Sequence, residues 1–179
     1  MKGAGEVTNS ELSEMLIKLS QGDKGAFEEI YNEINTSAFT VIYRITQDRH
    51  LSEDILQELF VRLYRNPPSA PIGNPRAYLM RMAHNLTIDA LRKQENNADI
   101  EDYENVLSDK RDSTEEKIDL DRALKCLSKE ERQLVVLHVN GGFKFREISD
   151  IMGIPPGTAM WKYHRAIKRL RDILNGGSI

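Results

Sequence analysis

The segment from residue 146 to residue 171, REISDIMGIPPGTAMWKYHRAIKRLR, restricts the possible folds more than any other part of the sequence. Its first residues predict a short helix that ends at Gly153. A second helix is expected to begin near Pro155 and Pro156, because proline is tolerated in a first helical turn. Apolar residues then recur at helical spacing and form one core-facing stripe: Ala159, Tyr163, Ala166, Ile167, Leu170, Ile173 and Leu174.

The opposite face of this second helix carries Trp161, with His164, Arg165 and Lys168 around it, while Met160 lies at the border between the two faces. Two helices joined by a tight turn, with a basic outer face on the second, are typical of a helix-turn-helix that reads DNA. A small helical bundle that binds RNA or protein through a basic surface would show the same local pattern. At this point both interpretations stay open.

The rest of the sequence also predicts helices. Ser128 and Glu131 form a capping box ahead of EERQLVVLHVNGG, whose glycines close a helix. Near the N-terminus Leu12, Met15, Leu16 and Leu19 make one apolar stripe. We therefore expect an all-α protein.

The segment LSEDILQELFVRLYRNPP predicts a helix with Ser52 as its N-cap and an end at the two prolines. Its inward face is formed by Ile55, Leu56, Leu59, Phe60 and Leu63. Its outward face comprises Asp54, Gln57, Glu58, Val61 and Arg65. Charges on a helix face are usually just solvated, but an apolar residue among them also fits a surface that binds a partner.

A further helix is expected to start at Asn74 and Pro75, a side-chain cap followed by proline. On it Arg81, Asn85 and Arg92 project to one side, an arrangement suited to phosphates and base edges. Asp89 lies beside this stripe, so a network of carboxylate and guanidinium groups on the helix surface is the competing interpretation.

Charge is unevenly distributed along the chain. The segment 94–121 holds 11 acidic and 3 basic residues, whereas 143–174 holds 7 basic and 3 acidic ones. Because the acidic stretch lacks a helical period, it predicts a flexible linker at 94–118 between two small helical domains, 1–93 and 119–179. The net charge of −3 argues against a protein that wraps nucleic acid with its whole surface.

Several classes of protein are not supported by the sequence. It has no long apolar segment, so we expect a cytoplasmic protein that does not insert into a membrane. Cys126 is the single cysteine, and the four histidines are scattered. We find no phosphate-binding glycine loop, nucleophile motif or metal-ligand spacing. The expectation is a protein that is not an enzyme and uses no metal or cofactor.

Four segments in succession resemble the extracytoplasmic-function (ECF) sigma factors of bacterial RNA polymerase: QGDKGAFEEIY, SEDILQELFVRLYR, RAYLMRMAHNLTIDALRK and REISDIMGIPPGTAMWKYHRAIKRLR. The resemblance covers about residues 20–93 and 119–174. It implies sigma domain two in the first half, sigma domain four in the second, and a linker that runs through the polymerase interior. It also implies a transcription initiation factor that binds core polymerase and directs it to promoters.

The resemblance implies roles for particular residues. The core-polymerase-binding set, which would contact the clamp coiled coil of the large subunit, is Asp54, Gln57, Glu58, Val61 and Arg65. The set expected to read and melt the minus-ten element is Arg76, Arg81, His84, Asn85 and Arg92. The loop 66–74 would hold a flipped base. The set expected at the minus-thirty-five element is Lys144, Met160, Trp161, Lys162, His164, Arg165, Lys168 and Arg169.

The sequence departs from the family pattern at two points. Lys144 stands where a serine cap is common, and Met160 and Trp161 replace the usual polar pair at the groove. Large apolar groups can contact thymine methyls but cannot donate to guanine. We therefore expect an unusual minus-thirty-five preference, with recognition carried by Arg165, Lys162 and backbone phosphate contacts.

Partners implied by the resemblance are the polymerase core, including its flap, promoter DNA and an anti-sigma factor. Two alternatives to a sigma factor are weighed against it. A stand-alone helix-turn-helix regulator would bind duplex DNA tightly without polymerase. A generic partner-binding helical protein would direct no transcripts.

Overall fold

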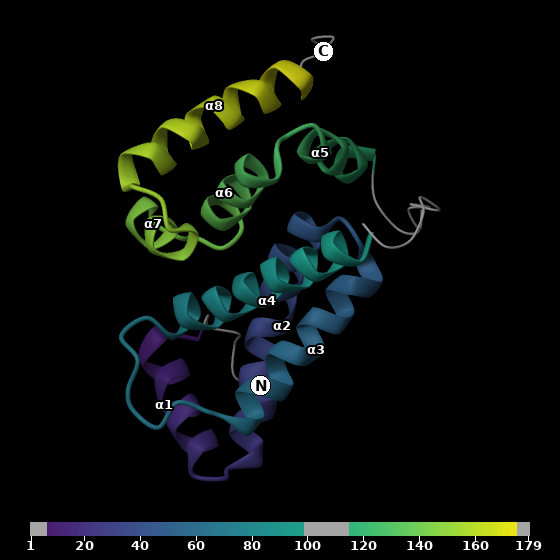
Figure 1. The fold of residues 1–179 in the computed structure, drawn as a ribbon. Coiled ribbons are helices and arrows are strands. Elements are labelled where there is room, and N and C mark those ends of the chain that lie inside the picture. Colours follow the sequence, from purple (N-terminus) through teal and green to yellow (C-terminus); the bar gives the residue numbers. More distant parts are fainter. Residues whose placement is uncertain (1–6, 99–114, 175–179) are drawn as a thin grey trace.

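The structure is a computed structural model that describes residues 7–98 and 115–174. Within these ranges every regular element is a helix, which confirms the all-α prediction. The elements are α1 (Asn9–Ser20), α2 (Lys24–Thr46), α3 (Arg49–Arg65), α4 (Pro75–Ala98), α5 (Glu115–Lys125), α6 (Lys129–Val139), α7 (Phe145–Met152) and α8 (Pro156–Leu174). In Figure 1, α1–α4 form one bundle and α5–α8 form a second bundle above it.

Local capping signals set most helix starts. The Thr8 side chain and Glu11 form a capping box at α1, and the carboxylate of Asp23 accepts a hydrogen bond from the Gly25 amide at 2.9 Å at the start of α2. At α4 the Asn74 side chain accepts from the Ala77 amide at 3.0 Å, as the Asn–Pro pair predicted. At α6 the predicted capping box of Ser128 is present.

The predicted N-cap of α3 is wrong. The helix begins one turn earlier, where the Asp48 carboxylate accepts from the Leu51 amide at 3.0 Å. Ser52 is fully buried inside the helix, and its hydroxyl donates back to the Asp48 carbonyl. The prediction named Ser52 alone, although aspartate caps a helix as well as serine does and Asp48 stands four residues earlier.

The second bundle has the predicted helix-turn-helix. Helix α7 ends at Gly153, whose φ of 66° is the left-handed conformation that glycine adopts at low cost. Helix α8 begins at Pro156, and Ala159, Ala166 and Leu170 of its stripe are buried. Leu174, expected in the same stripe, is 51% exposed because it is the last residue of the helix.

Helices extend into both ends of the predicted linker, since α4 continues to Ala98 and α5 begins at Glu115. The rest of the acidic segment, 99–114, lies outside the described residues, and so does the expectation that it runs through the polymerase. The division of the chain at 93 and 119 stays a prediction.

The two bundles pack against each other, which the sequence did not predict. Leu134, Leu137 and Ile148 belong to the same buried apolar cluster as the core of α1–α4. Two polar contacts also cross the junction. Arg132 Nη1 donates to the Ile45 carbonyl at 3.3 Å, and Asn74 Nδ2 donates to Glu147 Oε1 at 2.9 Å. In Figure 1, α6 and α7 accordingly lie over α2 and α4.

Candidate functional site

The outer face of α8 is arranged as the sequence predicted. Trp161 is 59% exposed and Met160 is 46% exposed, among the largest exposed apolar side chains of the described residues. His164, Arg165, Lys168 and Arg169 are exposed on the same helix. The helix therefore presents cations together with two large apolar groups to a ligand.

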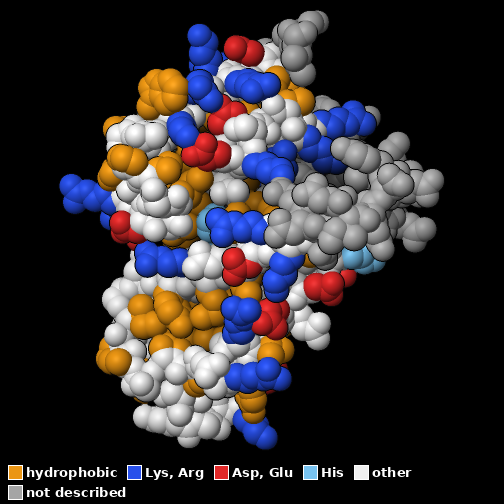
Figure 2. All heavy atoms as spheres, in the orientation of Figure 1, with side chains coloured by type: hydrophobic (Ala, Val, Ile, Leu, Met, Phe, Trp, Pro, Cys, Tyr) orange, Lys and Arg blue, Asp and Glu red, His pale blue; other side chains and the backbone are white. Residues whose placement is uncertain are grey.

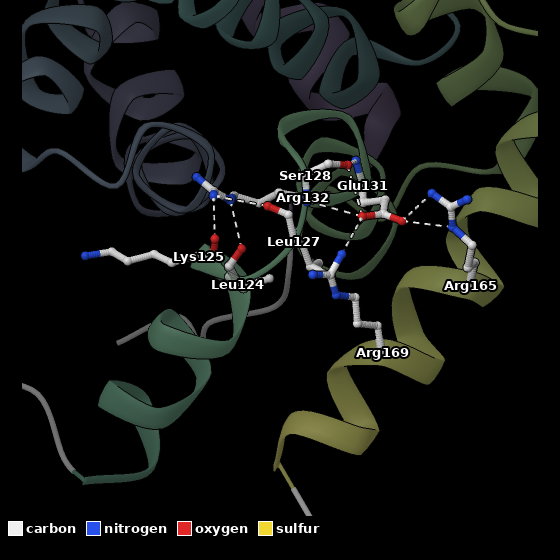
Figure 3. Close-up of polar contacts among 8 residues, drawn as sticks. All are labelled: Leu124, Lys125, Leu127, Ser128, Glu131, Arg132, Arg165 and Arg169. Carbon is white, nitrogen blue, oxygen red and sulfur yellow. Dashed lines mark hydrogen bonds and ion pairs between the residues drawn. The ribbon is translucent and has the colours of Figure 1, made fainter. Parts of the chain in front are cut away.

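Glu131 of α6 organises the cations of this face (Figure 3). Its side chain is only 4% exposed, and Oε1 accepts from Arg165 Nε at 3.0 Å and from Arg165 Nη2 at 2.7 Å. Arg169 Nη1 lies 3.8 Å from Oε2. Burial alone raises the pKa of Glu131, but the hydrogen bonds from Arg165 and Ser128 outweigh it and hold the pKa below its usual value. Glu131 is therefore ionised at neutral pH.

Two neighbouring cations of α8 make further contacts of this kind, one with an aromatic ring and one with a carboxylate. The guanidinium carbon of Arg165 lies 4.9 Å from the centre of the Trp161 ring, which is a cation–π contact. Lys162 Nζ lies 2.5 Å from Glu130 Oε1. Three of the predicted DNA-contacting cations are thus ion-paired with carboxylates of α6, a feature that sequence reasoning missed. The signal available was the pair of acids in the first turn of α6.

Lys144 is the N-cap residue of α7 and makes no side-chain cap. The carboxylate of Glu147 accepts from the Lys144 amide at 2.8 Å, which is only one of the two hydrogen bonds of a capping box. The hydrogen bond that a serine side chain would accept from the first turn of α7 is therefore missing, and the exposed Lys144 side chain remains a candidate phosphate contact.

The minus-ten set is only partly gathered on one surface. Arg81, Asn85 and Arg92 are exposed on α4, as their spacing predicted. The placement of His84 with them is contradicted, because its side chain is 4% exposed and is covered where α4 meets α6. The Arg76 guanidinium is occupied by contacts within the protein, since it donates to the Val7 carbonyl at 2.7 Å and pairs with Glu33.

Asn85 and Arg92 border a hollow of about 520 Å³ between α4 and the second bundle, which Lys129, Glu130 and Gln133 line from α6. In Figure 2, Lys and Arg side chains gather over the upper part of this face and across its middle, where Figure 1 places α5–α8 and α4. The exposed basic residues of α4 and those of the second bundle therefore lie near each other (Figure 1 and Figure 2).

The polymerase-binding set divides between two grooves. Gln57, Val61 and Arg65 line a groove of about 750 Å³ between α2 and α3. Asp54 and Glu58 line a different groove, of about 460 Å³, between α3 and α4. The five residues are therefore distributed over the two grooves that flank α3.

The larger groove is mainly apolar and aromatic, which the sequence reasoning missed. Tyr31 and Tyr64 are 41% and 48% exposed at its surface. The rings of Phe27 and Tyr64 are 5.3 Å apart, and those of Tyr31 and Phe60 are 4.7 Å apart. The available signal was an aromatic pair spaced i, i+4 on each of two neighbouring helices.

Comparison with known proteins agrees with this architecture. Residues 30–97 match sigma-70 region 2, and residues 117–170 match sigma-70 region 4. The ECF RNA polymerase sigma factor SigK of Mycobacterium tuberculosis is 25% identical over 178 residues, covering 93% of this chain and 95% of SigK. SigE of Mycolicibacterium smegmatis is 30% identical over 167 residues, covering 86% of this chain and 64% of SigE.

Solved structures share the fold. The sigma factor RpoE of Bartonella quintana, in complex with the anti-sigma factor NepR, superposes with a TM-score of 0.70 at 22% identity, over 85% of this chain and 98% of RpoE. CnrH, in complex with the cytosolic domain of CnrY, gives a TM-score of 0.65 at 17% identity, over 96% of this chain and all of CnrH.

Two sigma-70 regions in this order define a sigma factor, a protein that binds RNA polymerase and selects promoters. Within that class, the chain belongs to the ECF sigma factor family. A stand-alone regulator is accordingly not favoured. None of the helices in 7–98 and 115–174 combines the length and apolar character needed to cross a membrane. The same ranges contain no cluster of three or more potential metal ligands.

Proposed function

We propose that the groove between α2 and α3 binds the clamp coiled coil of the polymerase, that α4 reads the minus-ten element, and that the outer face of α8 reads the minus-thirty-five element. The observation that supports this most is that the three surfaces differ in chemical character. The groove is apolar and aromatic, whereas the exposed faces of α4 and α8 carry arginine and lysine.

The groove suits a helical partner. Its apolar lining includes Leu56, Phe60 and Val61 with the two tyrosines, and Glu53 and Arg65 also line it. An amphipathic helix laid in such a groove buries its apolar side and pairs its charges at the rim. We place core-polymerase binding mainly on this groove, with Gln57, Val61 and Arg65, and propose that Asp54 and Glu58 extend the interface into the neighbouring α3–α4 groove.

The arrangement of the two bundles has a consequence for promoter binding. Elements centred at minus ten and minus thirty-five are roughly 25 base pairs apart, which is roughly 85 Å of duplex at 3.4 Å per base pair. A compact chain of 179 residues has a radius of gyration of about 16 Å. The packed arrangement cannot span both elements, so the bundles have to separate when the chain joins polymerase at a promoter.

Polymerase carries out the chemistry of transcription, and the role of this chain is to place it and to help open the strands in the cytoplasm. RpoE and CnrH each have an inhibitory or regulatory partner in their solved complexes. We propose that an anti-sigma factor likewise binds this chain and holds it inactive.

Run-off transcription with purified core polymerase on a library of genomic promoter fragments tests the proposal. The chain should direct specific transcripts only when core polymerase is present, and it should bind the same fragments weakly alone. Tight binding to duplex DNA without polymerase, with no specific transcripts, would instead establish a stand-alone regulator. Absence of both activities would leave a generic partner-binding protein.

A further inference from the structure

Trp161 lies on the exposed face of α8, where it can contact a ligand but does not contribute to the core. It is the single tryptophan of the chain, and it is 59% exposed on the side of α8 opposite the buried Ala159, Ala166 and Leu170. Met160 beside it is 46% exposed. An exposed tryptophan does not stabilise the core of its own domain. Exposed large apolar groups mark interaction sites, so we expect a ligand to bury this side chain.

The position of Arg165 indicates how the indole is oriented. Two of its nitrogens, Nε and Nη2, donate to the same oxygen of Glu131, and its guanidinium carbon lies 4.9 Å from the Trp161 ring centre. Glu131 is itself held by the Ser128 amide and hydroxyl, at 3.2 Å and 3.0 Å. The chain Ser128–Glu131–Arg165–Trp161 therefore runs from the start of α6 to the outer face of α8.

This arrangement alters what each residue can contribute to reading DNA. An arginine that reads guanine uses two parallel N–H groups of a guanidinium free to align with the base. Arg165 has its guanidinium held against Glu131, and Lys162 is paired with Glu130 at 2.5 Å. Lys168 is exposed without such a carboxylate partner among the described residues, and the largest exposed apolar side chains on this face are Met160 and Trp161. The C5-methyl of thymine is the apolar group that the major groove offers to them.

We propose that Trp161 is the specificity-determining residue of the minus-thirty-five reader and contacts a thymine C5-methyl group, and that Arg165, itself fixed by Glu131, is a positioning residue that holds the indole. The proposal rests on the proposed function of α8. It replaces the expectation that Arg165 and Lys162 carry recognition.

Methyl deletion in the DNA tests the contact. Holoenzyme is assembled from core polymerase and the full chain, and a minus-thirty-five element obtained from the promoter library is synthesised with each thymine replaced in turn by deoxyuridine. One substitution should reduce transcription by roughly three- to fivefold, the effect of losing one buried methyl group. With Trp161→Ser the same substitution should have no effect. Deoxyuridine placed in the spacer between the two elements is the matched DNA control.

Arg165 is tested through the same ratio. The measured quantity is the ratio of transcription from the thymine template to transcription from the deoxyuridine template. In Arg165→Ala this ratio should fall towards one. In the double variant with Trp161→Ser it should fall no further. A purely structural ion pair or a phosphate contact would lower transcription on both templates by the same factor. It would leave the ratio at its wild-type value, which would overturn the positioning role. Thermal unfolding of each variant separates these effects from loss of the fold.

The outcomes distinguish this inference from the proposed function. If wild-type holoenzyme directs transcripts from the promoter but no thymine-to-deoxyuridine change alters them, the inference is wrong and α8 reads DNA by other groups. The same conclusion follows if the selected elements have no required thymine. If transcripts do not depend on core polymerase or on the minus-thirty-five element at all, the proposed function itself fails. A Trp161→Ser variant with unchanged transcription and template ratio would show that the indole does not read DNA.

Discussion

Replacement of His84 by leucine should stabilise this protein, although histidine at this position was expected to contact DNA. The side chain is 4% exposed, and neither ring nitrogen has a hydrogen-bond partner, although the amides of Asn85 and Gln133 lie nearby. An unsatisfied buried polar group costs about 1–3 kcal/mol. His84→Leu removes that cost and keeps an apolar side chain in the junction, so the free energy of unfolding should rise by about 1 kcal/mol or more.

The pH dependence gives a second readout. Burial lowers the pKa of His84 from its ordinary value of 6.5, and the nearby amides of Gln133 and Asn85 offset this only partly. The folded protein therefore binds fewer protons than the unfolded chain, so the stability contributed by the neutral ring is present above pH 6.5 and is lost as the pH falls below it. At pH 5.5 the loss is at most about 1.4 kcal/mol, because the unfolded histidine gains no more than that from protonation.

Urea unfolding at pH 7.5 and pH 5.5 measures both effects. His84→Leu should be more stable than wild type at pH 7.5 and should lose less stability at pH 5.5. The matched control is His50→Leu, since His50 is exposed in the first turn of α3 and its replacement removes no buried ring. The reasoning is refuted if His84→Leu is less stable than wild type at pH 7.5, or if its pH difference equals that of wild type.

Three further predictions concern single contacts. Leu56→Asp should weaken binding to core polymerase at least about tenfold in a titration, because a charge buried in the α2–α3 groove costs more than about 1.4 kcal/mol; unchanged affinity would remove the groove from the interface. Ser128→Ala should lower the free energy of unfolding by about 1 kcal/mol in urea, whereas Ser128→Thr, which retains the hydroxyl cap, should lower it less. Arg76→Gln should cost about 1–2 kcal/mol in the same assay, because it breaks the pair with Glu33. Minus-ten recognition should persist in this variant, and its selective loss would restore Arg76 to the DNA-contacting set.

Features set by neighbours in the chain could be predicted from the sequence. The capping box at Ser128, the Asn74 cap and the turn at Gly153 depend on residues within four positions, so pattern alone was sufficient. The outward direction of Trp161 followed from the 3.6-residue period of α8, because a long apolar stripe sets the phase of a helix. Where two local signals competed, as with Asp48 and Ser52 at α3, pattern did not suffice.

Features that join distant residues required the folded chain. Glu131 and Arg165 are 34 positions apart and meet because α6 and α8 pack together, which converts a presumed DNA-contacting cation into part of an ion pair. The aromatic groove exists because α2 and α3 lie side by side. His84 is buried where Lys129, Glu130 and Gln133 of α6, at least 45 positions further along the chain, lie against α4. Helical periodicity reports which face of a helix is apolar, but it does not report which other helix will cover a polar residue at the edge of that face.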